Sequence, residues 1–203
     1  MGHPSPARVV TRHEVIGLRP GAALRQAVEM AERAGADQRS ALVGRVTPDD
    51  WATYRQVRLA ALADSPAAFS STLEREVAFG EQTWRQRLGQ SPTFLAWQDG
   101  EAAGTVTALS GELAGLSDFP GAWDLVAMWV RPAARGLGIG RLLVQTVIDQ
   151  ATAAGAPSLA LWVFDANEPA KALYERMGFR ATDRTDTRPG NPQDVEHLMI
   201  REL

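Results

Sequence analysis

The sequence contains no cysteine. Disulfide bonds, thiolate metal sites and thiol nucleophiles are therefore excluded. Long apolar stretches are also missing, because the longest uninterrupted runs fall far short of the ~20 residues that a membrane helix needs. There is no excess of positive charge either: 24 acidic residues outnumber 21 Lys and Arg, which gives a formal net charge of -3. We therefore expect a cytoplasmic protein that binds neither membranes nor, in a sequence-independent way, nucleic acids.

The composition that remains is that of an ordinary globular protein, with 45% hydrophobic and 22% charged residues in a chain of 203. This length suits one domain and a modest appendage. A strand signal at Leu42–Val46 indicates where the domain begins. The expected division is an N-terminal extension over residues 1–41 and one domain over residues 42–203. Within the extension, Val9–Leu18 suggests a strand and Ala22–Ala34 a helix.

Helix and strand signals alternate along the predicted domain. After Leu42–Val46, the expected strands are Thr93–Gln98, Ala102–Leu109, Ala122–Val130, Ser158–Phe164, Gly178–Asp183 and His197–Leu203. The expected helices are Pro48–Ala63, Leu73–Leu88, Arg141–Ala154 and Pro169–Met177. Thr47 and Pro48 form a helix-start signal, and Asp99-Gly100 is typical of a hairpin turn. This order of elements predicts an α/β fold with a mixed sheet.

The segment between the strand Ala122–Val130 and the next helix carries the strongest signal of a ligand site. Three glycines stand there at alternate positions: Gly136, Gly138 and Gly140. Glycines let backbone N–H groups approach a ligand closely. The helix that begins near Gly138 adds its dipole and its unpaired N–H donors. Arg135 and Arg141 add full positive charges, so the segment predicts a site for a pyrophosphate.

The same glycines allow two other interpretations. A glycine-rich turn can merely connect a strand to a helix. A dinucleotide-binding fingerprint would also begin with Gly136-x-Gly138, and Asp165 closes the following strand where a ribose-binding acid could lie. However, the third glycine of that fingerprint falls at Arg141, and the loop after Val130 is long for such a turn.

Two motifs in this part of the chain follow a recognisable pattern. The first is Val130-x-Pro132-x-x-Arg135-x-x-Gly138-x-Gly140. The second is Asn167-x-x-Ala170-x-x-x-Tyr174-x-x-x-Gly178-Phe179. They resemble the acetyl-CoA pyrophosphate motif and the second signature of the GNAT superfamily of N-acetyltransferases. Residues 58–69 are also similar to the first-helix region of many bacterial members, so the resemblance covers residues 42–203.

The resemblance implies a fold in which two central parallel strands, Ala122–Val130 and Ser158–Phe164, splay apart and helices cover both faces of the sheet. The pantetheine arm of acetyl-CoA would lie in the gap, paired with backbone near Met128, Trp129 and Val130. Asn167 would also contact the pantetheine. The pyrophosphate would be held by the backbone of Gly136, Leu137, Gly138, Ile139, Gly140 and Arg141.

The resemblance also implies two catalytic residues. Tyr174 lies where the family carries its general-acid tyrosine, which protonates the leaving thiolate; the alternative is a tyrosine that only packs. Asp124 matches the strand position at which the histone acetyltransferase branch carries its glutamate base, and it would act through a water. The alternative for Asp124 is a solvated carboxylate at the start of a strand. Trp162 occupies the base position of another branch and cannot accept a proton. Backbone N–H near Met128 would stabilise the oxyanion.

The implied reaction is direct transfer of the acetyl group of acetyl-CoA to a primary amine in a ternary complex. The acceptor is open between a small molecule and a protein lysine or N-terminus, and the chain could act as a monomer or a homodimer. The alternatives from other classes are a non-catalytic acyl-CoA-binding sensor and a nucleotide-dependent oxidoreductase. No metal is expected, because the three histidines (His3, His13 and His197) lack metal-ligand spacing.

Several features outside the two motifs also bear on the acceptor site. The segments Ala63–Phe69 and Thr185–Gln193 are expected to be loops that flank the acceptor entrance. Trp123 or Trp129 is a candidate wall of the acceptor pocket. Three charged residues are interpreted as a solvated helix face rather than a site: Glu74, Arg75 and Glu76.

Overall fold

The computed structural model describes residues 25, 27–29, 41–188 and 191–203. The strand expected at Val9–Leu18 lies outside these residues. The helix expected at Ala22–Ala34 is described only at residues 25 and 27–29, which are helical.

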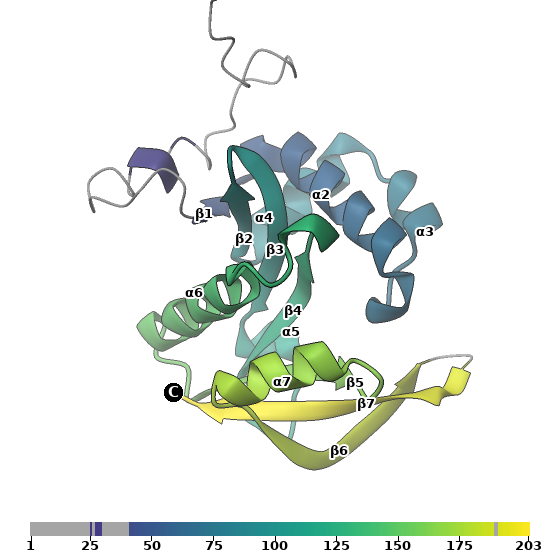
Figure 1. Ribbon diagram of the computed structural model, residues 1–203. Coiled ribbons are helices and arrows are strands. Elements are labelled where there is room, and N and C mark those ends of the chain that lie inside the picture. Colours follow the sequence, from purple (N-terminus) through teal and green to yellow (C-terminus); the bar gives the residue numbers. More distant parts are fainter. Residues whose placement is uncertain (1–24, 26, 30–40, 189–190) are drawn as a thin grey trace, which may run out of the picture.

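A single mixed sheet organises the described residues (Figure 1). Its strands are β1 (Leu42–Val46), β2 (Thr93–Gln98), β3 (Glu101–Leu109), β4 (Trp123–Val130), β5 (Ser158–Phe164), β6 (Arg180–Arg188) and β7 (Asn191–Glu202). They lie in the order β1-β2-β3-β4-β5-β7-β6. Every neighbouring pair is antiparallel except β4 and β5, which are parallel. The predicted mixed α/β sheet is confirmed.

The parallel pair at the centre of the sheet is joined over only a short length. Its ladder consists of Trp123 opposite Leu159 and Asp124 opposite Ala160. Beyond Asp124 the two strands are no longer paired, although β4 continues to Val130. The expected splay of the central strands is therefore present, and it leaves a gap between β4 and the second half of β5.

Helices cover both faces of the sheet, as expected. They are α2 (Trp51–Asp64), α3 (Leu73–Val77), α4 (Glu81–Gln90), α5 (Gly111–Ala114), α6 (Ile139–Ala153) and α7 (Glu168–Arg176), with single 3₁₀ turns at Pro48–Asp50, Pro66–Ala68 and Pro132–Ala134. The two green helices in Figure 1, α6 and α7, contribute Leu143 and Tyr174 to one core cluster. Helices α2 and α4 contribute Leu62 and Trp84 to a second cluster on the other face. Each of the described helices is too short or too polar to span a bilayer.

Local signals explain most of these boundaries. The Thr47 amide and hydroxyl both donate to an Asp50 carboxylate oxygen, at 3.0 and 2.9 Å, which fixes the turn that leads into α2. In the β2–β3 hairpin, Asp99 and Gly100 both have positive φ, at 53° and 77°. Such a pair suits the twist of a tight hairpin, so the predicted turn is confirmed.

Two sequence predictions about elements are wrong, and one element was missed. The single helical segment Leu73–Leu88 is two helices, because the chain turns at Gly80, whose extended backbone caps the start of α4. The predicted loop Thr185–Gln193 is mostly strand, since β6 and β7 pair through Thr185 opposite His197 and beyond. Its residues are almost all polar and lie in an exposed hairpin, which composition alone does not distinguish from a loop. The short helix α5 was not predicted.

Candidate active site

The gap between β4 and β5 opens into a cavity of about 770 Å³. Both strands line it, together with residues of α2, α4 and α7 and the segment between α2 and α3. Ligand pockets commonly have this volume and form where elements from several parts of a chain converge. The cavity brings together four of the predicted site residues: Asp124, Met128, Asn167 and Tyr174.

A β-bulge in β4 marks the place where the gap begins. Thr105 lies opposite Trp129 and Thr107 opposite Val126, so two residues of β4 face a single residue of β3. Ala127, one of those two, has a φ of 54°, which is unusual for a residue other than glycine. A bulge bends its strand and interrupts its pairing, so this bulge explains why β4 turns away from β5.

Main-chain groups of β4 point into the gap. The Arg131 amide donates to the carbonyl oxygen of Ala103, which lies on the neighbouring strand β3, at 2.8 Å. Because successive residues of a strand direct their N–H and C=O groups to opposite sides, Val130 and Met128 direct theirs toward the gap. Trp129, between them, faces β3. Met128 and Val130 thus offer an edge at which an extended ligand can pair.

The glycine-rich segment forms an open cradle at the start of α6. Gly136 and Gly138 have φ values of 80° and 82°, and a Cβ on either would meet nothing within 4 Å. Gly138 caps α6, and the first bond of that helix runs from the Leu142 amide to the Gly138 carbonyl. The N–H groups of residues 139–141 therefore have no acceptor inside the helix. This donor set suits a diphosphate.

Arg135 does not extend freely over this cradle. Its Nε donates to the Val130 carbonyl oxygen at 3.0 Å, and its Nη2 lies 2.5 Å from the Asp64 carboxylate at the end of α2. The same Asp64 oxygen accepts from the Trp129 indole at 2.9 Å. Hydrogen bonds from Ser65 and Trp129 hold the pKa of Asp64 below its ordinary value. Sequence reasoning missed Asp64, which lies inside the segment that it assigned to the acceptor entrance.

Tyr174 lies on α7 and is buried, with only 6% of its surface exposed. Its ring packs edge-on against Phe179, at 5.9 Å between ring centroids. Burial raises the pKa of Tyr174 above its ordinary value of 10, so the phenol keeps its proton at neutral pH. The side chain both packs in the core and lines the cavity. This position suits both alternatives for Tyr174, a packing residue and a proton donor.

Asp124 enters the cavity from the opposite face of the sheet. Its neighbour Leu125 packs in the cluster under α6, and alternation along β4 turns Asp124 to the other side. The side chain is buried, and Oδ1 has no hydrogen-bond partner among the described residues. Burial and the nearby Glu196 carboxylate raise the pKa of Asp124 to about 7. The interpretation of Asp124 as a solvated carboxylate is therefore wrong.

The other predicted residues divide between the cavity and the core. Asn167 lines the cavity and caps α7, because its side-chain oxygen accepts from the Ala170 amide at 3.3 Å. Neither Trp123 nor Trp129 lines the cavity, which corrects the expectation for both; Trp162 does. Among the residues that the structure describes, no three His, Asp or Glu side chains form a group that could hold a metal ion.

A buried ion-pair cluster was also missed. Glu76, interpreted as part of a solvated helix face, is fully buried. Arg58 binds it through Nε and Nη2, at 3.1 and 2.9 Å, and Arg87 adds a third bond at 3.0 Å. Burial alone would raise the pKa of Glu76, but Arg58 and Arg87 together lower it to about 2. Both arginines line the cavity.

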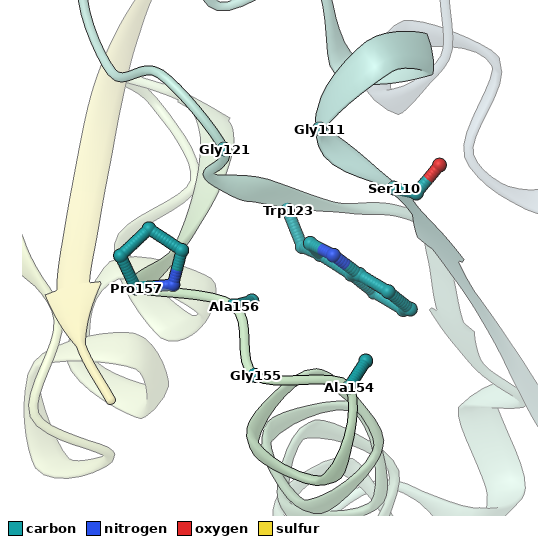
Figure 2. Close-up of a pocket in the computed structure, with 8 residues that line it drawn as sticks. All are labelled: Ser110, Gly111, Gly121, Trp123, Ala154, Gly155, Ala156 and Pro157. Atoms are coloured by element: carbon teal, nitrogen blue, oxygen red, sulfur yellow. The ribbon is translucent and has the colours of Figure 1, made fainter.

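A second hollow, of about 510 Å³, lies at the start of β4, beside Trp123 (Figure 2). Small residues surround it, and Figure 2 shows the Trp123 ring between the Ser110–Gly111 turn and the chain that leaves α6 at Ala154. It contains no ionisable side chain and none of the predicted catalytic residues. The larger cavity is therefore the candidate active site.

The splayed sheet, its gap and the glycine-rich helix start define the N-acetyltransferase fold of the GNAT type. The chain belongs to the Acetyltransferase (GNAT) family, whose profile matches residues 56–179. Two solved structures share the fold: a GNAT-family acetyltransferase from Streptococcus pneumoniae (TM-score 0.65, 21% identity, 81% of this chain and 100% of that one), and the PaiA N-acetyltransferase of Thermoplasma acidophilum in complex with coenzyme A (TM-score 0.61, 14% identity, 81% and 99%).

Curated relatives are similar over parts of their length. The mycothiol acetyltransferase of Thermomonospora curvata is 31% identical over 131 residues, which are 64% of this chain and 40% of that protein. The peptidyl-lysine N-acetyltransferase YjaB of Escherichia coli is 27% identical over 106 residues, 52% of this chain and 61% of that protein. The chain thus spans about two fifths of the mycothiol enzyme, and the names of these two relatives refer to different molecules, mycothiol and peptidyl-lysine.

Proposed function

We propose that this protein transfers the acetyl group of acetyl-CoA directly to a primary amine, and that the catalytic unit is residues 42–203. The observation that supports this most strongly is that β4, whose second half is unpaired with β5, leads along the chain into the open cradle at Gly136 and Gly138. A diphosphate in the cradle and an extended thioester arm in the gap match the two halves of acetyl-CoA. Membership of the family supports the same donor.

The donor would be held mainly by backbone groups. The free N–H groups at the start of α6, with Gly136, would bind the diphosphate. Met128 and Val130 would pair with the amides of the pantetheine arm, and Asn167 would contact that arm from the end of β5. Arg141 would add positive charge beside the diphosphate. Arg135 would contribute while it remains partly neutralised by Asp64.

Two side chains from opposite faces of the sheet would move protons. Acetyl-CoA supplies an activated acyl group with a thiolate as leaving group. Asp124, with a pKa of about 7, can accept a proton from the attacking amine through a water at neutral pH. Tyr174 retains its phenolic proton and can give it to the departing sulfur. The Met128 amide would stabilise the oxyanion. With no cysteine in the chain, the acyl group cannot pass through an enzyme thiol.

The test combines binding with turnover. The protein is incubated with acetyl-CoA and a panel of amines, and free thiol is measured as coenzyme A is released. We expect thiol release that depends on both the amine and the protein. Binding of acetyl-CoA without release on every amine would instead favour a non-catalytic acyl-CoA sensor. Protection against thermal unfolding by NAD but not by coenzyme A would indicate a nucleotide-dependent oxidoreductase.

A further inference from the structure

The cluster of Arg58, Glu76 and Arg87 has no role in the transfer reaction described above, yet its two arginines line the same cavity. Two guanidinium groups surround one carboxylate, so the cluster keeps one uncompensated positive charge. Arg87 donates to Glu76 through Nη1, and its side chain is 37% exposed. A charge of this kind at a cavity wall attracts an anionic group.

Arg58 adds a donor that has no acceptor. Its side chain is 7% exposed, and Nε and Nη2 are both bonded to Glu76. Nη1 is buried without a hydrogen-bond partner among the described residues. The ring of Phe69, which lies on the flank of the cavity, covers the guanidinium at 4.5 Å. Leaving a charged donor buried without an acceptor is costly, so this atom indicates a ligand that brings one.

Neutral donors surround the same end of the cavity. Hydroxyl groups line it at Ser70, Ser71, Thr72, Ser91, Thr93 and Thr107. Thr93 and Thr107 bond to each other at 3.0 Å, and Tyr54 is hydrogen-bonded to Thr107. Hydroxyls and guanidinium groups together form the donor set that carboxylates and phosphates require.

Acidic groups lie at another part of the cavity, where Asp124 and Glu196 line it. Asp124 is on β4 and Glu196 on β7, whereas Arg58 and Arg87 are on α2 and α4. The cavity therefore has a basic wall and an acidic wall. An acceptor with one anionic group and one amine matches both walls, with the amine directed to Asp124.

We propose that the acceptor is a small primary amine that also carries an anionic group, and that Arg58 and Arg87 bind this group. This inference rests on the proposed acetyl transfer and narrows its acceptor class. An amine without an anionic group, such as a lysine in a neutral peptide, leaves the basic wall unpaired and is the poorer acceptor.

The test compares matched acceptors that differ only in charge. Amino acids with increasing separation between amine and carboxylate, from glycine to 6-aminohexanoate, are compared with their amides and with aminoalkylphosphonates. For the favoured length we expect the anionic form to exceed its amide by tenfold or more in kcat/KM, which is the worth of one charged hydrogen bond. The phosphonates show whether the site prefers a carboxylate or a phosphate. Equal use of acids and amides at every length would overturn the proposal.

Three variants assign the preference to the cluster. Arg87→Gln should raise KM for the anionic acceptor about tenfold and leave the amide unchanged. Glu76→Gln should increase the preference, since it removes the only negative charge in the cluster. The control is Arg85→Gln on the same helix, because Arg85 pairs with Asp49 and Glu81 outside the cavity. An Arg87→Gln protein with undiminished preference would contradict the role given to the cluster.

Folding and inactivity are handled separately. Arg58→Met alone removes the main partner of the buried Glu76 carboxylate, which destabilises the fold. Arg58→Met is therefore combined with Glu76→Met, so that apolar side chains of similar size replace the buried pair. This double variant should fold and should weaken the preference without abolishing it, because the buried Nη1 donor of Arg58 is removed and Arg87 remains. If no amine supports thiol release, the transfer proposal fails, but the acceptor site is still tested by thermal shift: the amino acid should stabilise the wild-type protein more than its amide does, and equal shifts would overturn the inference.

Discussion

The Arg135 guanidinium lies 2.5 Å from the Asp64 carboxylate, which ties the end of α2 to the loop before the glycine cradle. Asp64 also accepts from the Trp129 indole. One carboxylate therefore connects the acceptor side of the molecule, where α2 lines the cavity, to the proposed donor site. The same carboxylate also disfavours binding of an anion at the donor site, because its negative charge lies beside Arg135, the arginine that begins the R-x-x-G-x-G motif.

This relationship predicts that Asp64→Asn will bind coenzyme A more tightly. The amide oxygen can still accept from Trp129, so the fold should be retained, while Arg135 is no longer neutralised. Since the pair is partly exposed, the gain should be about 2- to 5-fold in Kd, the range of exposed ion pairs. Calorimetric titration at low and high salt measures it, and the gain should shrink at high salt. Weaker binding by the variant would show that Asp64 supports the site rather than opposing it.

Gly138→Trp should abolish binding of coenzyme A. The side chain would occupy the open space above the start of α6, where the diphosphate is proposed to bind. The substitution also strains a residue with positive φ, so the control must carry equal strain. Gly115→Trp provides it, because Gly115 has a φ of 66° and open space around it, and ends α5 far along the chain from the cradle. Retained binding in Gly138→Trp would mean that the site is misplaced.

Tyr174→Phe should lower kcat by about 100-fold and change the affinity for acetyl-CoA little. Phenylalanine keeps the edge-on contact with Phe179 and removes only the proton donor. Thiol release gives kcat, and calorimetry gives the affinity. A variant with wild-type kcat would remove Tyr174 from the mechanism and leave it as a packing residue.

The activity of the wild-type protein should rise with pH through about 7, because Asp124 accepts a proton only when it is ionised. In Asp124→Asn that step in the pH profile should be missing and the rate lower by about 100-fold. Acceptors of different amine pKa separate this step from ionisation of the amine. An identical profile in the two proteins would exclude Asp124 as the base.

The same carboxyl predicts a change in stability. The pKa of Asp124 is higher in the folded protein than its ordinary value of 3.8. Its contribution to stability is therefore complete below that ordinary value and is lost as the pH rises through about 7. In thermal unfolding, the stability of Asp124→Asn relative to the wild-type protein should increase from pH 4 to pH 8. A constant difference across this range would indicate that Asp124 is not shifted.

Short-range signals explain how much of this fold was predictable. The bounds of β1, β2 and β5 agree with the sequence analysis, because apolar runs ended by turn residues identify such strands. The cradle was found for the same reason, since its glycines and its helix start are adjacent in sequence. The gap between the central strands was predicted from the family resemblance, because no local sequence pattern indicates it. Its physical cause is the bulge at Ala127, a residue that gives no sequence signal of positive φ.

Long-range pairing explains what was missed. Glu76 lies on a short charged helix whose sequence is typical of a solvated face. In the fold it is buried, because it pairs with Arg58, 18 residues earlier. The Arg135 partner, Asp64, is 71 residues away. The raised pKa of Asp124 likewise depends in part on Glu196, which lies on β7, far along the chain. Ionisable residues become informative here only when the fold shows what they face.

Calorimetric titration of the folded protein with acetyl-CoA and with coenzyme A, in parallel with Gly138→Trp, tests the central claim most directly. The account predicts saturable binding of both ligands by the wild-type protein and none by the variant. If the wild-type protein binds neither ligand, then the main-chain donors at the start of α6 do not hold a diphosphate, and the proposed donor, mechanism and acceptor site lose their common foundation.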